Sequence, residues 1–274
     1  MLFTRLPSPS LSPFVRRLWA IDTTGAPHPS LRARERVLPT GEMHLVFRLT
    51  DHPLRLFSAA DDSTGRIIGH TIVGGVASTY YLRDVSLPVQ SVGVQLHPAA
   101  CELLFGVPAA ELAGRHVSLD SFWGASAEEA RDRLQQRSNL EDKTTILESI
   151  LAGRLPRMRG LHPAVAHALR RFEVSASVGQ VVQESGWSHR QFIELFRQAM
   201  GMTPKAYSRL MRFQGAVRKL TADPKAPASG VALDAGYSDQ PHLNREFLEF
   251  AGVTPGEYRA LSPARPHHVP IRSR

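Results

Sequence analysis

The sequence predicts an α+β protein of two domains, an N-terminal antiparallel β-barrel or β-sandwich with helices and a C-terminal all-α double helix-turn-helix. Three observations support this prediction. Short apolar runs broken by Gly and Pro precede residue 98, amphipathic helical patterns follow residue 160, and the C-terminal region repeats itself at a spacing of 51 residues. A chain of 274 residues with 42% hydrophobic content is long enough to build a core for each domain.

The N-terminal region has the pattern of strands between Arg36 and His97. Apolar runs at 44–47, 67–68 and 92–94 are separated by Gly and Pro, which favours antiparallel strands. After Pro98 we expect short helices at 101–104 and 108–112 and a longer helical stretch at 126–151. The apolar stripe of that last stretch packs on its own domain or forms a dimer seam. We favour packing.

Residues 153–160 combine Gly, Pro and clustered Arg, as linkers do. We therefore expect a first domain at 1–153 and a second at 161–262. A helix at 162–172 should brace the second domain, with Arg170 and Arg171 as candidates for phosphate contact. Residues 263–274 are rich in Pro, Arg and His and are predicted to form a disordered basic tail.

Charge is divided unevenly along the chain. Residues 1–152 carry 15 Lys and Arg against 16 Asp and Glu, whereas residues 153–274 carry 18 against 9. A basic domain attached to a neutral one indicates a polyanionic partner. The single cysteine, Cys101, excludes an internal disulfide and is expected to be a packed thiol. No apolar run is long enough for a membrane span and no signal sequence is evident, so we expect a cytoplasmic, nucleoid-associated protein without membrane contact.

The internal repeat indicates two copies of one supersecondary unit. Gly201, Thr203-Pro204 and Tyr207 recur as Gly252, Thr254-Pro255 and Tyr258. Gly186-Trp187 recurs as Gly236-Tyr237 at an offset of 50, so the second copy has one extra turn residue. The two units are expected at about 178–199 and 228–251.

The first unit has the pattern of helix, tight turn, helix. Residues 178–185 form a short helix that Gly186 ends in the left-handed conformation, and Ser188 caps the next helix. Phe192, Leu195 and Phe196 face inward at helical spacing. The long polar side chains then lie on the solvent side: His189, Arg190, Gln191, Glu194 and Arg197.

The second unit repeats this plan. Gly236 makes the turn, Asp239 caps the second helix, and Leu243, Phe247 and Phe250 face the core. The outer face carries Gln240, His242, Asn244 and Arg245. Arg binds guanine, Gln pairs with adenine and Glu accepts from cytosine in the major groove, although a solvated helix face explains each side chain individually about as well.

A helix from Pro204 to about Leu220 should separate the two units. Its length of roughly 26 Å approaches the ~34 Å that separates successive major-groove segments on one face of DNA.

On these residues the C-terminal region resembles the AraC/XylS family of bacterial transcriptional regulators. The matching residues are Gly186-Trp187-Ser188, Phe192, Phe196, Gly201, Thr203-Pro204, Tyr207, Arg212, Ala216, Leu220, Gly236-Tyr237-Ser238-Asp239-Gln240, Gly252, Thr254-Pro255 and Tyr258-Arg259. The resemblance implies that the second helix of each unit lies in the major groove. It transfers base contact to Arg190, Ile193 and Glu194 in one copy and to Gln240, Pro241 and Arg245 in the other. Val182, where alanine is usual, and Pro241 depart from the pattern.

The N-terminal region is similar to the cupin-like sensory domains that precede this unit in many bacterial regulators, on Leu38-Pro39-Thr40-Gly41 and Gly93-Val94-Gln95-Leu96. This resemblance implies effector sensing or dimerisation. His44, His70 and His97 are isolated in sequence, so we expect no metal site, no cofactor and no catalytic residues.

The sequence therefore predicts a regulator that binds double-stranded DNA and responds to a small-molecule effector, with RNA polymerase and a second copy of the chain as further candidate partners. Two alternatives stay open: a metal-dependent cupin-type enzyme fused to a DNA-targeting domain, and a constitutive DNA-binding protein whose first domain only dimerises. The effector and its binding residues, the operator, and activation against repression are not determined by the sequence.

Overall fold

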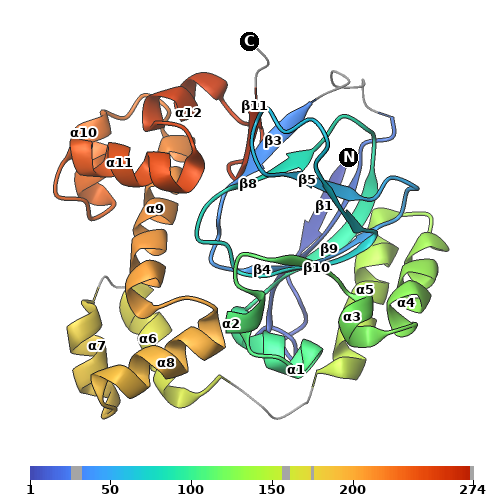
Figure 1. The fold of residues 1–274 in the computed structure, drawn as a ribbon, viewed down its shortest axis with the longest axis horizontal. Coiled ribbons are helices and arrows are strands. Elements are labelled where there is room, and N and C mark those ends of the chain that lie inside the picture. Colours follow the sequence, from blue (N-terminus) through green and yellow to red (C-terminus); the bar gives the residue numbers. More distant parts are fainter. Residues whose placement is uncertain (26–32, 156–160, 174–175, 272–274) are drawn as a thin grey trace.

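The computed structural model describes residues 1–25, 33–155, 161–173 and 176–271. The N-terminal half and one strand from the C-terminal end form two antiparallel sheets that face each other as an open sandwich (Figure 1). The first sheet has the order β1-β2-β9-β4-β7-β10, and its strands are Leu2–Arg5, Val15–Asp22, Gln90–Leu96, Met43–Arg48, Thr71–Gly74 and His116–Ser118. The second has the order β11-β3-β8-β5-β6, with strands His268–Ile271, Arg34–Val37, Tyr81–Asp84, Leu54–Phe57 and Arg66–Gly69.

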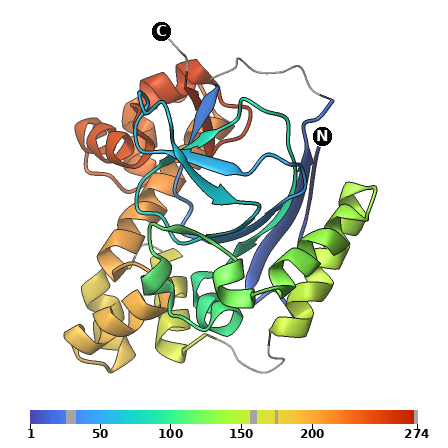
Figure 2. The same ribbon diagram turned by 45° about the vertical axis from the view of Figure 1, so that its right-hand side comes forward.

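Helices cover the outer face of the first sheet (Figure 2). They are η1 (Pro98–Ala100), α1 (Cys101–Phe105), α2 (Ala109–Leu112), α3 (Asp120–Trp123), α4 (Ser126–Gln135) and α5 (Leu140–Arg154). Leu18, Phe47 and Val94 on the sheet and Leu147 and Leu151 on α5 are buried in one core. The stripe predicted at 126–151 thus packs on its own domain.

The C-terminal half is helical, and a long helix, α9, separates two groups of shorter ones (Figure 1). Its helices are α6 (Pro163–Glu173), α7 (Val178–Ser185), α8 (His189–Met200), α9 (Pro204–Ala222), α10 (Ala228–Asp234), α11 (Gln240–Ala251) and α12 (Pro255–Leu261). The predicted α+β class with a β-sandwich and a double helix-turn-helix is confirmed. No helix in the described ranges is long and apolar enough to cross a bilayer.

The structure differs from the sequence-based expectation in several elements. The first two strands, β1 and β2, precede the region where strands were expected. The single helical stretch at 126–151 is two helices, because the side chain of Asn139 accepts a hydrogen bond from the backbone N–H of Asp142 and starts α5 there. The linker expected at 153–160 begins inside α5, and its residues 156–160 lie outside the described residues.

The prediction of a disordered tail at 263–274 is wrong for residues 268–271. These residues form β11, which pairs antiparallel with β3, His268 opposite Val37 and Ile271 opposite Arg34. Val269 is fully buried in the main core, and His268 bonds Glu35 across 2.7 Å. Ordering these residues costs conformational entropy, and the composition of the tail predicted that it would stay disordered. Strand pairing and burial offset this cost.

Candidate nucleic-acid interface

The first helix-turn-helix unit, α7 and α8, is built by local interactions. Gly186 ends α7 with φ +71°, a conformation that glycine adopts without strain. The Ser188 hydroxyl then accepts a hydrogen bond from the backbone N–H of Gln191 and caps α8. Phe192 and Phe196 are fully buried, so the opposite face of α8 points outward. The helices and caps predicted for this unit are confirmed.

The outer face of α8 carries side chains of both charges. His189, Arg190, Gln191 and Glu194 are exposed, while Ile193 and Arg197 are half-buried. Within the described residues Arg190 makes no hydrogen bond or ion pair. It is therefore free to contact a ligand.

Glu194 and Arg197 are instead paired with each other. Arg197 donates to the Glu194 carboxylate over 2.8 and 3.1 Å, and the Gln198 amide donates to it over 2.6 Å. These bonds, that of Arg197 first, lower the pKa of Glu194 to about 2. The pair therefore uses part of the guanidinium and of the carboxylate that Arg197 and Glu194 could offer to a base.

The second unit, α10 and α11, repeats the geometry. Gly236 turns the chain with φ +85°, and the Asp239 carboxylate accepts from the backbone N–H of His242 over 2.7 Å. Leu243 and Phe247 are fully buried. Pro241 leaves the helix intact because it lies in the first turn, where backbone N–H groups have no partner within the helix.

The side chains on the outer face of α11 make fewer hydrogen bonds and ion pairs with the rest of the protein than those of α8. Gln240, Pro241 and Arg245 are exposed and Asn244 is half-buried, and within the described residues no partner bonds Gln240, Asn244 or Arg245. The side chain of His242 instead lies against the turn before α11, where its Nδ1 is 3.1 Å from the Ser238 hydroxyl. Its ring meets Tyr237 edge-on, with centroids 5.2 Å apart.

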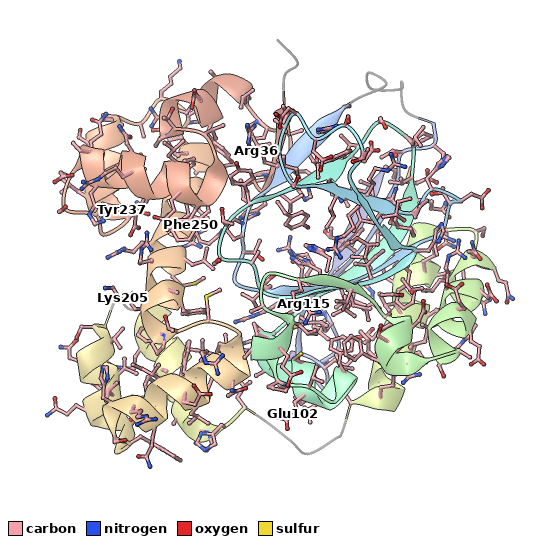
Figure 3. The ribbon with its side chains drawn as sticks, viewed as in Figure 1. Arg36, Glu102, Arg115, Lys205, Tyr237 and Phe250 are labelled. Atoms are coloured by element: carbon pink, nitrogen blue, oxygen red, sulfur yellow. The ribbon has the colours of Figure 1, made fainter. Side chains whose placement is uncertain are left out.

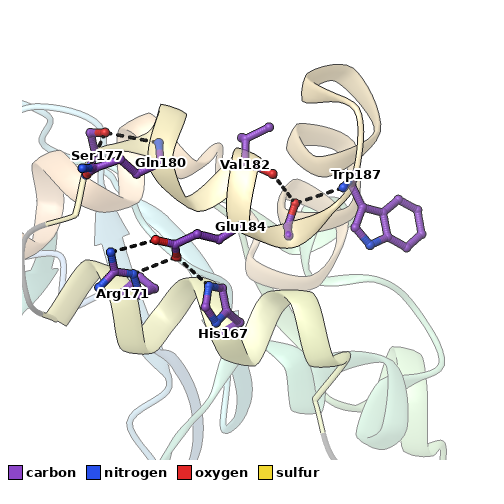
Figure 4. Close-up of polar contacts among 8 residues, drawn as sticks. His167, Arg171, Ser177, Gln180, Val182, Glu184 and Trp187 are labelled. Atoms are coloured by element: carbon purple, nitrogen blue, oxygen red, sulfur yellow. Dashed lines mark hydrogen bonds and ion pairs between the residues drawn. The ribbon is translucent and has the colours of Figure 1, made fainter.

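Ion pairs link neighbouring helices in both units, one of them buried and the other exposed. Glu246 on α11, only 6% exposed, is 2.7 Å from Arg209 and 3.2 Å from Arg212, both on α9. In the first unit Glu184 joins α7 to α6 through His167 at 2.8 Å and Arg171 at 2.8 and 2.9 Å (Figure 4). Arg171, expected as a phosphate contact, is thus occupied by Glu184, whereas Arg170 is exposed. The sequence pattern did not identify Glu246, because its partners lie on another helix.

Val182, the other departure from the family pattern, is buried on α7 within the main core. Its extra volume over alanine is therefore accommodated by packing.

The N-terminal domain contacts the C-terminal ends of α8 and α11. Gly201, after α8, lies against Ala109 and Val76, where an added Cβ would be 3.1 Å from the Ala109 carbonyl oxygen. At α11 the Tyr80 backbone N–H donates to the Phe250 carbonyl oxygen over 3.0 Å. Figure 3 shows Phe250 on the side of the helical domain that faces the sandwich, with Tyr237 farther from it. One loop, residues 75–80, therefore touches both units.

Burial shifts the pKa values of several titratable side chains in the sandwich. Burial, followed by the charge of His116, lowers the pKa of His44 to about 3, and burial lowers that of His116 to about 4. Among the described residues no group of three or more His, Cys, Asp or Glu side chains is placed to hold a metal ion. Cys101 is buried, as expected, and burial raises its pKa to about 12.

These features define a two-domain protein that joins a β-sandwich to a pair of helix-turn-helix units. Residues 165–261 match the family model described as "Helix-turn-helix domain", and residues 4–118 match that of "Domain of unknown function (DUF6597)". The C-terminal region thus carries an AraC-type helix-turn-helix domain.

The similar curated proteins are named as HTH-type transcriptional regulators or activators. The chain is 26% identical over 141 residues to the HTH-type transcriptional regulator ArgR of Pseudomonas aeruginosa, covering 47% of this chain and 43% of that protein. It is 33% identical over 72 residues to the RCS-specific HTH-type transcriptional activator RclR of Escherichia coli, covering 26% and 25%. The chain thus spans less than half the length of these relatives.

Two solved structures are also similar to this chain. An AraC-type transcriptional regulator from Chromobacterium violaceum is 26% identical, with 37% of this chain and 94% of that chain covered and a TM-score of 0.34. A ligand-free single-residue variant of ToxT from Vibrio cholerae is 11% identical, with coverages of 94% and 100% and a TM-score of 0.49.

Proposed function

We propose that this protein is a transcriptional regulator that binds double-stranded DNA in a sequence-specific way through both helix-turn-helix units. One observation carries the proposal. Helices α8 and α11 bury one apolar side each, present outer faces rich in polar side chains, and lie at opposite ends of the α9 rod. Such faces fit two successive segments of the major groove.

The candidate DNA-binding residues fall into groups that differ in whether the side chain already bonds another residue of the protein. Arg190 and Arg245, which have no partner among the described residues, are suited to guanine, and Gln240 and Asn244 to adenine. Ser188 and Asp239 cap the helices and set the position of the first turn beside the phosphates. The remaining members of the proposed surface are His189, Gln191, Ile193, Glu194, Arg197, Pro241 and His242.

The N-terminal domain is proposed to regulate this binding in response to a small-molecule effector. The contacts of one loop support this proposal. Loop 75–80 touches the ends of both α8 and α11, so a movement of the sandwich would change the position of both helix-turn-helix units. We propose no cofactor and no catalytic activity. RNA polymerase and a second copy of the chain are the remaining proposed partners. We also propose that the boundary between the two domains lies within 153–160.

Selection of bound duplexes from a random-sequence library by the full-length chain tests the DNA proposal. We expect a two-part consensus, and an affinity that falls linearly with salt concentration on a logarithmic plot. Recovery of no consensus, with equal affinity for all duplexes, would overturn sequence-specific binding.

Genome-wide mapping of bound sites then supplies effector candidates from the neighbouring genes. Titration of those compounds into the complex of protein and selected duplex separates an effector-responsive regulator from a constitutive binder, since only the regulator changes its affinity for DNA. Metal analysis of the purified chain tests the alternative of a metal-dependent enzyme, which requires a stoichiometric transition metal.

A further inference from the structure

The outer face of α11 contains one apolar side chain that the polar pattern did not identify. Leu248 is 49% exposed, and it follows Pro241 by seven residues, Asn244 by four and Arg245 by three. At 3.6 residues per turn these four side chains share the face opposite the buried Leu243 and Phe247. Leu248 therefore lies within the surface proposed to enter the major groove.

The internal repeat gives Leu248 a counterpart in the first unit. The spacing of 51 residues that relates the two copies places Leu248 at the position of Arg197. Arg197 is a polar candidate contact and forms an ion pair with Glu194. The second copy replaces this charged side chain with an apolar one, so the two helices cannot recognise the same base at this position.

The surroundings of Leu248 favour contact with DNA. Arg245, one turn earlier, is a cation that no other described residue pairs. The neighbouring carboxylate of Glu249 is drawn toward α9 by Arg209, whose Nη2 lies 2.5 Å away. The acidic group next to Leu248 is thus neutralised, which removes a source of repulsion from phosphates.

We propose, resting on the DNA-binding function proposed above, that Leu248 determines specificity by packing against the C5-methyl group of a thymine. A leucine side chain has no hydrogen-bond donor or acceptor, and the thymine methyl is the apolar group that the base edges present in the major groove. With Arg245 beside it, the second half-site contains a thymine near a guanine. The two half-sites differ in sequence, so the operator is asymmetric.

The test uses the duplex selected by the full-length chain, with each thymine replaced in turn by deoxyuridine. This substitution removes one methyl group and leaves base pairing unchanged. For the wild-type chain we expect one thymine in the second half-site where replacement weakens binding about fourfold, the factor for one buried methyl group. L248A, which keeps a strong helix former, should bind the thymine and deoxyuridine duplexes equally.

The matched control is L233A. Leu233 is 66% exposed on α10, outside the proposed DNA surface, so its removal should leave the deoxyuridine effect at about fourfold. If L248A and the wild-type chain show the same sensitivity at every thymine, the inference is wrong while sequence-specific binding stands. If selection yields no consensus, the proposed function fails and this inference fails with it.

Discussion

The side-chain amide of Gln214 donates a hydrogen bond of 2.5 Å to the carbonyl oxygen of Pro39. Gln214 lies in the middle of α9, and Pro39 follows β3 in the sandwich. The other end of the same amide, Oε1, lies 2.8 Å from Nε2 of His267 in the C-terminal segment. One side chain, 6% exposed, therefore joins the rod between the two helix-turn-helix units to the N-terminal domain and to the tail.

Substitution Q214A should destabilise the protein by about 1–3 kcal/mol, because it leaves the Pro39 carbonyl and the His267 ring without their buried partner. Urea denaturation measures the loss. Q183A, at an exposed glutamine on α7, is the control and should stay within about 0.5 kcal/mol of the wild type. Equal stabilities of the two variants would show that the junction carries no stability.

Substitution G252A should loosen the contact between α11 and the sandwich. A Cβ at Gly252 would lie 2.4 Å from the Tyr80 ring, and the φ of +65° disfavours any other residue. We expect a loss of about 1–3 kcal/mol, together with faster proteolysis between the domains. G179A, where nothing lies within 4 Å of the added atom, should leave the protein as stable or stabilise it by up to about 1 kcal/mol. A neutral G252A would contradict the close approach.

Stability should fall as the pH falls from about 6.5 to 4. Burial lowers the pKa of His97 to about 4, below the value of about 6.5 in the unfolded chain. The unfolded state therefore binds more protons in this range, and each such histidine contributes up to about 1.4 kcal/mol per pH unit. Urea denaturation across this range measures the slope.

His97 gives the slope a specific test. Its Nδ1 is buried, and no hydrogen-bond partner for it lies within the described residues. H97Q removes this one titration and should reduce the slope by up to about 1.4 kcal/mol per pH unit, whereas H189Q, at an exposed histidine on α8, should leave it unchanged. An H97Q slope equal to that of the wild type would contradict the assignment.

Substitution V269A should cost about 1–3 kcal/mol, because Val269 in β11 is fully buried in the main core. L87A, at a leucine 44% exposed after β8, is the matched control with little expected effect. Thermal unfolding measures both. A V269A variant as stable as L87A would show that the tail strand does not contribute to the core in solution.

Substitutions R190A and R245A should each weaken binding to the selected duplex by about 1–3 kcal/mol and relax its sequence preference at one position. R133A, at an exposed arginine on α4, removes the same charge away from the proposed surface and should have little effect. Competition with mutated duplexes measures the preference. Uniform weakening on all sequences would assign the arginine to a phosphate instead of a base.

The helical domain was predictable because its signals are local. Gly186 and Gly252 end helices with positive φ, and Ser188 and Asp239 cap the helices that follow, all through contacts within a few residues. The same periodicity that buries Phe192 and Phe247 defines the outer faces of α8 and α11. The polar part of the candidate site follows from these rules. The proposed contact of Leu248 does not, because the rules assign polar side chains to a DNA-binding surface.

The sequence by itself determined the two repeated units, the rod between them, the basic charge of the second half and the strand character of the first. The tertiary structure decided that the tail completes the second sheet, that Glu246 is buried between two arginines, and that Gln214 joins three segments. The physical reason is distance along the chain. Helix caps and turns act between neighbours, but a strand partner such as Val37 for His268, or a buried carboxylate's counter-ion, is chosen only when remote segments fold against each other.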